Sequence, residues 1–284
     1  MTSRQLAALT LLLACTSLFA QQPSAVTVDR APNHAAPTQN VETVLNSHGS
    51  HIMGMFLLAS GAEPHRTVIL LHGFPGYEQN LDLAQALRRD GFNVLAMHYR
   101  GSWGSQGAFS FTHSMEDVST MLDYLTQPAN VSKFHIDPHR IVVIGHSMGG
   151  FLTVAALAQH PQIAAGVVIT EGSPVHDVHD YFGESDPADY APLAGTSPTA
   201  LQHEAQSHTS DWSFPTFAAK TAPRPVLVVS ANDGLRASNE DLVAALKRAG
   251  APVTYQHFDT DHGFSDHRVA LESAILTWLD KTVR

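Results

Sequence analysis

The sequence is poor in cysteine, in positive charge and in long apolar runs. Cys15 is the single cysteine among 284 residues, so one chain can form no internal disulfide. If residues 1–20 are removed, no thiol is left for a nucleophile or a metal site. A net charge of −10 excludes nucleic acid as a partner, because no basic patch could neutralise its phosphates. After residues 1–20, no stretch is apolar enough to span a membrane.

Residues 1–20 have the outline of a secretory signal peptide. Arg4 supplies a positive charge, an apolar core runs from Leu6 to Ala14, and Ala20 is the small residue after which we expect cleavage. Two alternatives stay open: a fold-forming helix, or a lipoprotein, because Leu12-Leu13-Ala14-Cys15 resembles a bacterial lipobox in which Cys15 is acylated. The sequence therefore predicts an exported protein, periplasmic or secreted, with a lipid anchor at Cys15 as the alternative.

The rest of the chain predicts a linker and one α/β domain. Residues 21–40 are rich in Ala, Pro and Gln and lack periodicity, which is typical of a linker. Residues 41–284 fit one large domain, since 44% of the whole chain is hydrophobic. The domain begins with two β-like stretches, 41–47 and 52–59, and the polar residues between them favour a hairpin.

From Arg66 onward, short apolar runs alternate with amphipathic segments. The runs lack strict polar alternation, which is typical of strands covered on both faces. Strands are expected at 67–71, 93–98, 141–144, 165–170, 225–230 and 253–258, and helices at 81–90, 114–126, 148–160, 239–249 and 267–282. Successive strand–helix units predict a mostly parallel, doubly wound sheet.

Residues 172–224 interrupt this alternation, because they separate two strands by more than one helix requires. A long insertion at the functional end of a sheet favours a lid or cap. An irregular crossover with no role in binding is the alternative.

The chemistry is predicted to centre on Ser147. Gly145-His146-Ser147-Met148-Gly149 matches G-x-S-x-G, and it lies between an apolar strand and an Ala-rich helix, as a nucleophile elbow requires. The flanking glycines leave room for the sharp turn, and the helix N-terminus favours a developing oxyanion. The alternative is a Gly-rich turn with an idle serine.

A serine needs a base, and the base needs an acid that orients it. His262 follows the last expected strand and is the favoured base, with His267 as the substitute, whereas His257 falls within the strand. Asp233, after the strand at 225–230, is the favoured acid. The remaining candidates are less favoured: Asp177 or Asp180 as the fallback acid, and Asp261 as a more distant neighbour of the histidine.

A glycine-rich turn predicts the oxyanion hole. The strand at 67–71 leads into His72-Gly73-Phe74-Pro75-Gly76. One oxyanion donor should be the backbone N–H of Met148, and the other the backbone N–H of Phe74, since Pro75 has none. An ordinary turn is the alternative.

These landmarks resemble those of the α/β-hydrolase superfamily, and the loop from Tyr99 to Gly107 is similar to one in the prolyl oligopeptidase clan. The resemblance runs from about Thr67 to the C-terminus. It implies an α/β-hydrolase fold and acyl transfer through an acyl-enzyme, with no metal or organic cofactor. Residues 21–66 are too short for the propeller that peptidases of this clan usually carry, so the expected substrate is a small ester, as for dienelactone hydrolase-like esterases.

Other functions and contacts are alternatives. A dipeptidyl- or oligopeptidase-like activity is the second hypothesis, and a binding protein without chemistry is the third. Arg100, Trp103 and Glu171 could contact substrate, although packing or ion pairing within the loop is an equal alternative for the first two. Among 18 histidines, only His176 and His179 with nearby aspartates invite a metal hypothesis, and solvated surface histidines are the favoured interpretation. The sequence leaves the oligomeric state open.

Overall fold

The computed structural model describes residues 22–176 and 187–284. In chain order their elements are α1 (Ser24–Thr27), β1 (Gln39–Ser47), β2 (Ser50–Leu58), β3 (His65–Leu71), α2 (Leu81–Arg89), β4 (Asn93–Met97), α3 (Phe111–Thr126), α4 (Pro128–Lys133), β5 (Ile136–His146), α5 (Met148–Gln159), β6 (Ala165–Ile169), the 3₁₀-helix η1 (Pro187–Tyr190), α7 (Pro198–Ser207), α8 (Phe214–Thr221), β7 (Val226–Ser230), α9 (Arg236–Arg248), β8 (Val253–His257) and α10 (Arg268–Thr282).

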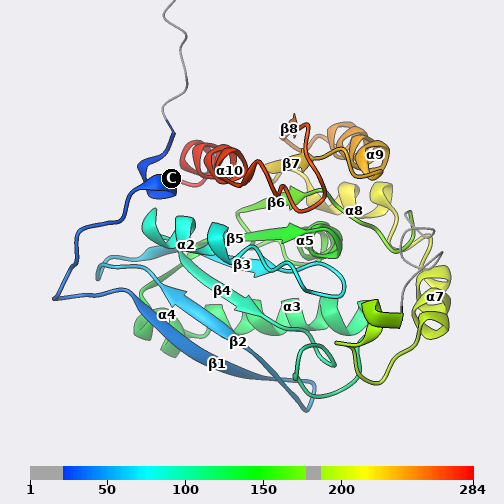
Figure 1. The fold of residues 1–284 in the computed structure, drawn as a ribbon, viewed down its shortest axis with the longest axis horizontal. Coiled ribbons are helices and arrows are strands. Elements are labelled where there is room, and N and C mark those ends of the chain that lie inside the picture. Colours follow the sequence, from blue (N-terminus) through cyan, green and yellow to red (C-terminus); the bar gives the residue numbers. More distant parts are fainter. Residues whose placement is uncertain (1–21, 177–186) are drawn as a thin grey trace, which may run out of the picture.

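The strands of the described residues form one eight-stranded sheet in the order β1-β2-β4-β3-β5-β6-β7-β8 (Figure 1). β1 and β2 pair antiparallel as a tight hairpin, with Ser47 opposite Ser50. β2 also runs antiparallel to β4, and every further pair is parallel. The predicted hairpin and the predicted mostly parallel, doubly wound sheet are therefore confirmed.

Helices cover both faces of this sheet (Figure 1), which explains why its strands carry continuous apolar runs. In β3, Ile69 and Leu71 pack into the cluster formed with α3, α5, α8 and α9. Val68 and Leu70 point the other way, into the cluster formed with α1, α2 and α10. Each of these fully buried side chains contributes roughly 1.5–3 kcal/mol of transfer free energy.

The parallel strands place the candidate site residues at one edge of the sheet. Their carboxyl ends lie side by side, because parallel neighbours run in the same direction. His72 directly follows β3, Ser147 follows β5 and Thr170 follows β6. The loops after β7 and β8 carry Asp233 and His262.

The N-terminal segment packs on the opposite side of the molecule from these loops. Ala25 and Val26 of α1 are buried against α2 and α10, and Arg89 donates from Nε to the Ala25 carbonyl at 2.5 Å. Part of the predicted linker is thus docked on the domain, while its boundaries stay a prediction. The predicted signal peptide, residues 1–20, lies outside the described residues.

The interruption between β6 and β7 contains the crossover helix that a parallel pair needs. α8 packs between α5 and α9 and performs this role. Before it, η1 and α7 lie near the start of α3, where the Glu204 carboxylate accepts the N–H groups of Phe111 and Thr112 at 3.0 and 2.8 Å. The predicted insertion 172–224 therefore combines a crossover with extra elements, and its action as a lid stays a prediction.

Candidate active site

Ser147 sits on a strained turn between β5 and α5. Its backbone has φ 56° and ψ −122°, a conformation that costs free energy for a residue with a side chain. The neighbouring glycines are required because a side chain at either position would overlap backbone atoms. A Cβ on Gly145 would lie 1.9 Å from the Gly149 carbonyl oxygen, and one on Gly149 would lie 2.3 Å from the Leu71 carbonyl oxygen. The half-buried serine is thereby held at the N-terminus of α5.

His262 and Asp233 come together as predicted. His262 Nδ1 lies 2.8 Å from Asp233 Oδ2. The Asp233 side chain is 2% exposed and that of His262 is 42% exposed. Because an ionised carboxylate only accepts hydrogen bonds, Nδ1 carries the proton, and the other ring nitrogen, Nε2, keeps its lone pair. This arrangement gives a base whose tautomer is fixed by a buried acid.

Two further donors hold the Asp233 carboxylate. Thr170 Oγ1 donates to Oδ2, the oxygen that also receives the His262 proton, and the Leu235 N–H donates to Oδ1 at 3.0 Å. Burial opposes ionisation, but these hydrogen bonds and the one from His262 outweigh it and lower the pKa of Asp233. The carboxylate is therefore ionised at neutral pH. Thr170 was not among the predicted site residues.

His146, the second residue of the G-x-S-x-G motif, binds the backbone of the proposed base, His262. Its Nε2 lies 2.8 Å from the backbone oxygen of His262 and must donate to it. The two rings are tilted, with centroids 4.7 Å apart. Burial lowers the pKa of His146 to about 3, so the ring is neutral. This contact brings His262 to the elbow that carries Ser147, and sequence reasoning missed it.

The glycine turn after β3 lies against the serine. A Cβ on Gly73 would be 2.9 Å from Ser147 Cβ and 3.4 Å from its Oγ, so only glycine lets the turn pass this close. Phe74 is the next residue of this turn, and Met148 opens α5 on the other side of Ser147. Both residues thus adjoin the segments that meet at Ser147, and their role as oxyanion donors stays a prediction.

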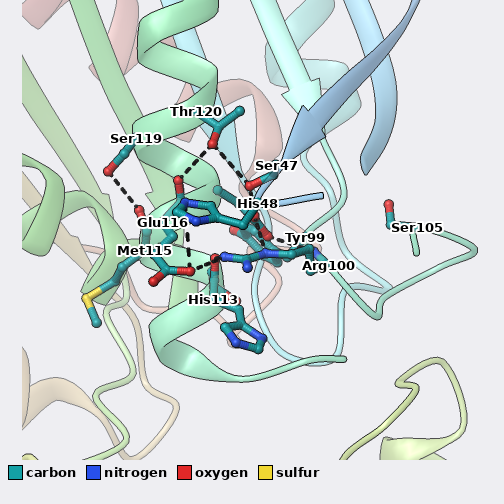
Figure 2. A network of polar contacts seen from close by, with 12 residues as sticks. Ser47, His48, Tyr99, Arg100, Ser105, His113, Met115, Glu116, Ser119 and Thr120 are labelled. Atoms are coloured by element: carbon teal, nitrogen blue, oxygen red, sulfur yellow. Dashed lines mark hydrogen bonds and ion pairs between the residues drawn. The ribbon is translucent and has the colours of Figure 1, made fainter. Parts of the chain in front are cut away.

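Of the predicted substrate contacts, Arg100 is held in an ion-pair network (Figure 2). Its Nε lies 2.7 Å from Asp117 Oδ1 and its Nη2 lies 2.5 Å from Glu116 Oε2. Asp117 also accepts from Ser47 of β1. The Arg100 side chain is 6% exposed, so these contacts give it a structural role, and a contact with substrate stays a prediction.

Trp103 and Glu171 occupy different surroundings. The Trp103 indole N–H donates to the Pro75 carbonyl at 2.8 Å, and its ring meets the Tyr77 ring edge-on at 5.1 Å. Glu171 follows β6 and is fully buried, with its backbone N–H and carbonyl both bonded to the Asn239 amide. Their predicted contacts with substrate stay predictions.

The alternative histidines and acids lie in other places. His257 ends β8 and pairs with Ser230, and His267 precedes α10. Asp261 accepts the Ser265 N–H at 2.8 Å. His176 stacks on Phe214 at 3.9 Å.

Several predicted features fall partly outside the described residues. Asp177, His179 and Asp180 lie there, so the fallback acid and the metal hypothesis cannot be placed. Within the described residues, no group of three or more His, Cys, Asp or Glu side chains could hold a metal ion. In the same part of the chain, no helix has both the length and the apolar character needed to cross a bilayer.

Known proteins resemble this chain in sequence and in fold. Dipeptidyl peptidase family member 6 of Caenorhabditis elegans is 26% identical over 230 residues, which cover 74% of this chain and 30% of that protein. The hyperthermophilic esterase of Pyrobaculum calidifontis superposes with a TM-score of 0.68 at 18% identity, covering 88% of both chains. The acylaminoacyl peptidase of Pyrococcus horikoshii superposes with a TM-score of 0.65 at 18% identity, covering 87% of this chain and 42% of that one.

The chain spans less than half of the length of the curated relatives it matches. The solved structures share its fold, and their sequence identity is too low to carry more. The family model for the alpha/beta hydrolase fold matches residues 66–258, from the start of β3 to the end of β8. The chain therefore belongs to the α/β-hydrolase fold family.

Proposed function

We propose that this protein hydrolyses carboxylic esters through an acyl-enzyme, with Ser147 as nucleophile, His262 as base and Asp233 as the acid that orients the base. The observation that carries the proposal is the 2.8 Å hydrogen bond between His262 and Asp233 beside the strained elbow of Ser147. A buried carboxylate, a tautomerically fixed imidazole and a serine at a helix N-terminus are the parts that nucleophilic acyl transfer needs.

In the first half of the reaction, His262 Nε2 takes the Ser147 hydroxyl proton while Oγ bonds to the ester carbonyl carbon. The carbonyl oxygen becomes an oxyanion, which the N–H groups of Met148 and Phe74 would receive. When the intermediate collapses, the bond to the alkoxy oxygen breaks. His262 returns the proton to it, and the alcohol leaves.

In the second half, water attacks the acyl-enzyme. His262 takes a proton from the water as its oxygen bonds to the acyl carbon, and a second oxyanion forms in the same place. Collapse breaks the bond to Ser147 Oγ, which regains its proton from His262. The carboxylic acid leaves and the enzyme is restored. Throughout, Asp233 stabilises the imidazolium without taking its proton.

The extent of the likeness to solved structures favours an ester over a peptide as the substrate. The likeness to the Pyrobaculum calidifontis esterase covers 88% of both chains, whereas the likeness to the acylaminoacyl peptidase leaves more than half of that chain uncovered. A serine peptidase is the second candidate, favoured by the likeness to a dipeptidyl peptidase family member over 74% of this chain. Comparing p-nitrophenyl esters with peptide anilides separates the two, and faster cleavage of the anilides would reverse the order.

The direct test of the chemistry is labelling with a fluorophosphonate probe, followed by mass-spectrometric mapping of the adduct. We expect the adduct on Ser147 and none after Ser147→Ala. Ser119 offers a matched control, because its Oγ lies 2.8 Å from a histidine nitrogen, that of His160, but it stands on a regular helix instead of a strained turn. Ser119→Ala should keep full labelling. An absent adduct in the unaltered protein would favour a binding protein on the same fold.

We also propose that the enzyme acts after export, as the composition of residues 1–20 suggests. Sequencing the N-terminus of protein recovered from the periplasm or the medium tests this. A chain that starts just after Ala20 supports it, and an acylated Cys15 would replace it with the lipoprotein alternative.

A further inference from the structure

The turn that carries Phe74 is held by two side chains that the reaction itself does not use. His72 Nδ1 lies 2.8 Å from the Gly73 carbonyl oxygen, and the Trp103 indole N–H donates to the Pro75 carbonyl at 2.8 Å. The carbonyl groups of Gly73 and Pro75, the residues before and after Phe74, are therefore both fixed by hydrogen bonds.

The first of these contacts determines the tautomer of His72. A carbonyl oxygen can only accept, so His72 Nδ1 must carry the proton. Burial lowers the pKa of His72 to about 4, which keeps the ring neutral and leaves Nε2 as an acceptor. The tautomer with the proton on Nε2 would lose the bond to Gly73.

A second histidine completes this arrangement. His98 follows β4, the parallel neighbour of β3, and its Nδ1 lies 3.3 Å from His72 Nε2. Since His72 Nε2 is an acceptor, His98 Nδ1 must donate. The two contacts form a directed chain, from His98 through His72 to the Gly73 carbonyl. With the His98 proton on Nδ1, a His72 protonated on Nε2 would lose this hydrogen bond as well as the bond to Gly73.

The chain ends on the peptide that carries the Phe74 N–H. In a trans peptide the N–H points opposite to the C=O, so a bond that fixes the Gly73 carbonyl also fixes the direction of the Phe74 N–H. Gly73 itself lies against Ser147, since a Cβ added to it would be 3.4 Å from Ser147 Oγ. Donors for an oxyanion act through such preorganised direction.

We propose that His98 is a positioning residue for ester cleavage: by donating to His72 it selects the His72 tautomer that holds the Gly73–Phe74 peptide in its oxyanion-binding direction. This inference rests on the proposed function. It concerns a residue that contacts neither Ser147, His262 nor Asp233 through any hydrogen bond described above.

The kinetic test compares three variants in p-nitrophenyl ester hydrolysis. His98→Leu removes the donor, His98→Asn keeps an amide N–H close to the place of Nδ1, and His139→Leu alters an exposed histidine near the amino end of β5. His98 is half-buried beside a pocket of about 270 Å³, so both replacements have room.

We expect His98→Leu to lower kcat about 10-fold with KM changed by less than about twofold, because only transition-state stabilisation is lost. His98→Asn should recover kcat to within about threefold of the unaltered enzyme, and His139→Leu should match it. A packing role alone predicts no rescue by Asn. Equal kcat values for His98→Leu and the unaltered enzyme overturn the inference.

A spectroscopic readout does not depend on activity. In ¹⁵N-labelled protein, long-range ¹H–¹⁵N correlations of the imidazole rings should show His72 and His98 both protonated on Nδ1, with the His72 signals assigned by their loss in His72→Asn. A His72 ring protonated on Nε2 overturns the inference. If Ser147 takes no fluorophosphonate and no ester is cleaved, the proposed function fails. If both reactions occur and His98→Leu is unchanged, only the positioning role fails.

Discussion

His146 donates its Nε2 proton to the backbone oxygen of His262 at 2.8 Å, so the residue before the nucleophile holds the residue that activates it. Removing this bond should let the imidazole shift away from Ser147. We expect His146→Phe to lower kcat for an ester roughly 10-fold, since small displacements of catalytic groups are costly. His146→Gln, which keeps a donor, should lose much less. Equal losses in the two variants would assign the effect to packing.

Asp233 should matter through the tautomer of His262. In Asp233→Asn the amide cannot stabilise the imidazolium, and kcat should fall by about 10⁴-fold. The exposed Asp211, 74% accessible, gives a control, and Asp211→Asn should leave kcat unchanged. Steady-state kinetics of both proteins measure the difference, and a loss below about tenfold would count against Asp233 as the acid.

Ser147 and His262 should act as one unit. Ser147→Ala and His262→Ala should each lower ester cleavage by several orders of magnitude while substrate binding persists. The double variant should be little slower than either single one, because each replacement already abolishes the shared step. Near-additive losses in kcat would contradict a common proton transfer.

Sequence reasoning found the parts of the site that chain order and residue type specify. Ser147 was identifiable because the turn needs glycine on both sides, where an added Cβ would lie less than 2.5 Å from a backbone oxygen. Asp233 follows the buried strand β7, and His262 follows the last strand, β8. The sheet was predictable from its apolar runs, since strands covered on both faces have no polar alternation.

The missed residues act through contacts between residues that are far apart in the sequence. His146 bonds to a backbone oxygen, and Thr170 bonds to an oxygen of Asp233 that lies 63 residues further along the chain. Neither contact leaves a residue pattern. For Arg100 the sequence left substrate contact and ion pairing both open, and the structure pairs it with Asp117, a buried residue of α3. Which partner an arginine takes depends on how the loop packs, and periodicity does not reveal that.

Glu204 connects α7 to the start of α3 through two backbone N–H groups. A negative charge at a helix N-terminus contributes about 0.3–1 kcal/mol. We expect Glu204→Gln to lower the melting temperature by roughly 1–3 °C and to speed amide hydrogen exchange in residues 198–207. Glu240→Gln, at an exposed ion pair with Arg236, is the control and should change neither measurement. Unchanged exchange in Glu204→Gln would mean that other contacts hold α7.

Glu272 should make stability fall as the pH rises from acidic to neutral. Burial and the neighbouring Asp82 raise the pKa of this carboxyl to about 7. A folded-state pKa above the unfolded value means that the folded protein binds the proton more tightly, so stability is lost as pH rises from about 4.5 to about 7. Glu272→Gln should therefore melt a few degrees higher than the unaltered protein at pH 8, and the gap should close near pH 4. A gap that does not depend on pH would contradict this.

The docking of α1 has a practical consequence. Its partner Arg89 ends α2 just before β4 begins, and Pro23 lies beside Lys281 at the end of α10. This is the amino end of the parallel strands, whereas Ser147 and His262 lie at the carboxyl ends. An affinity tag or a surface linkage joined ahead of Gln22 would thus attach on the far side of the molecule, and an immobilised enzyme would still present its serine to the solution.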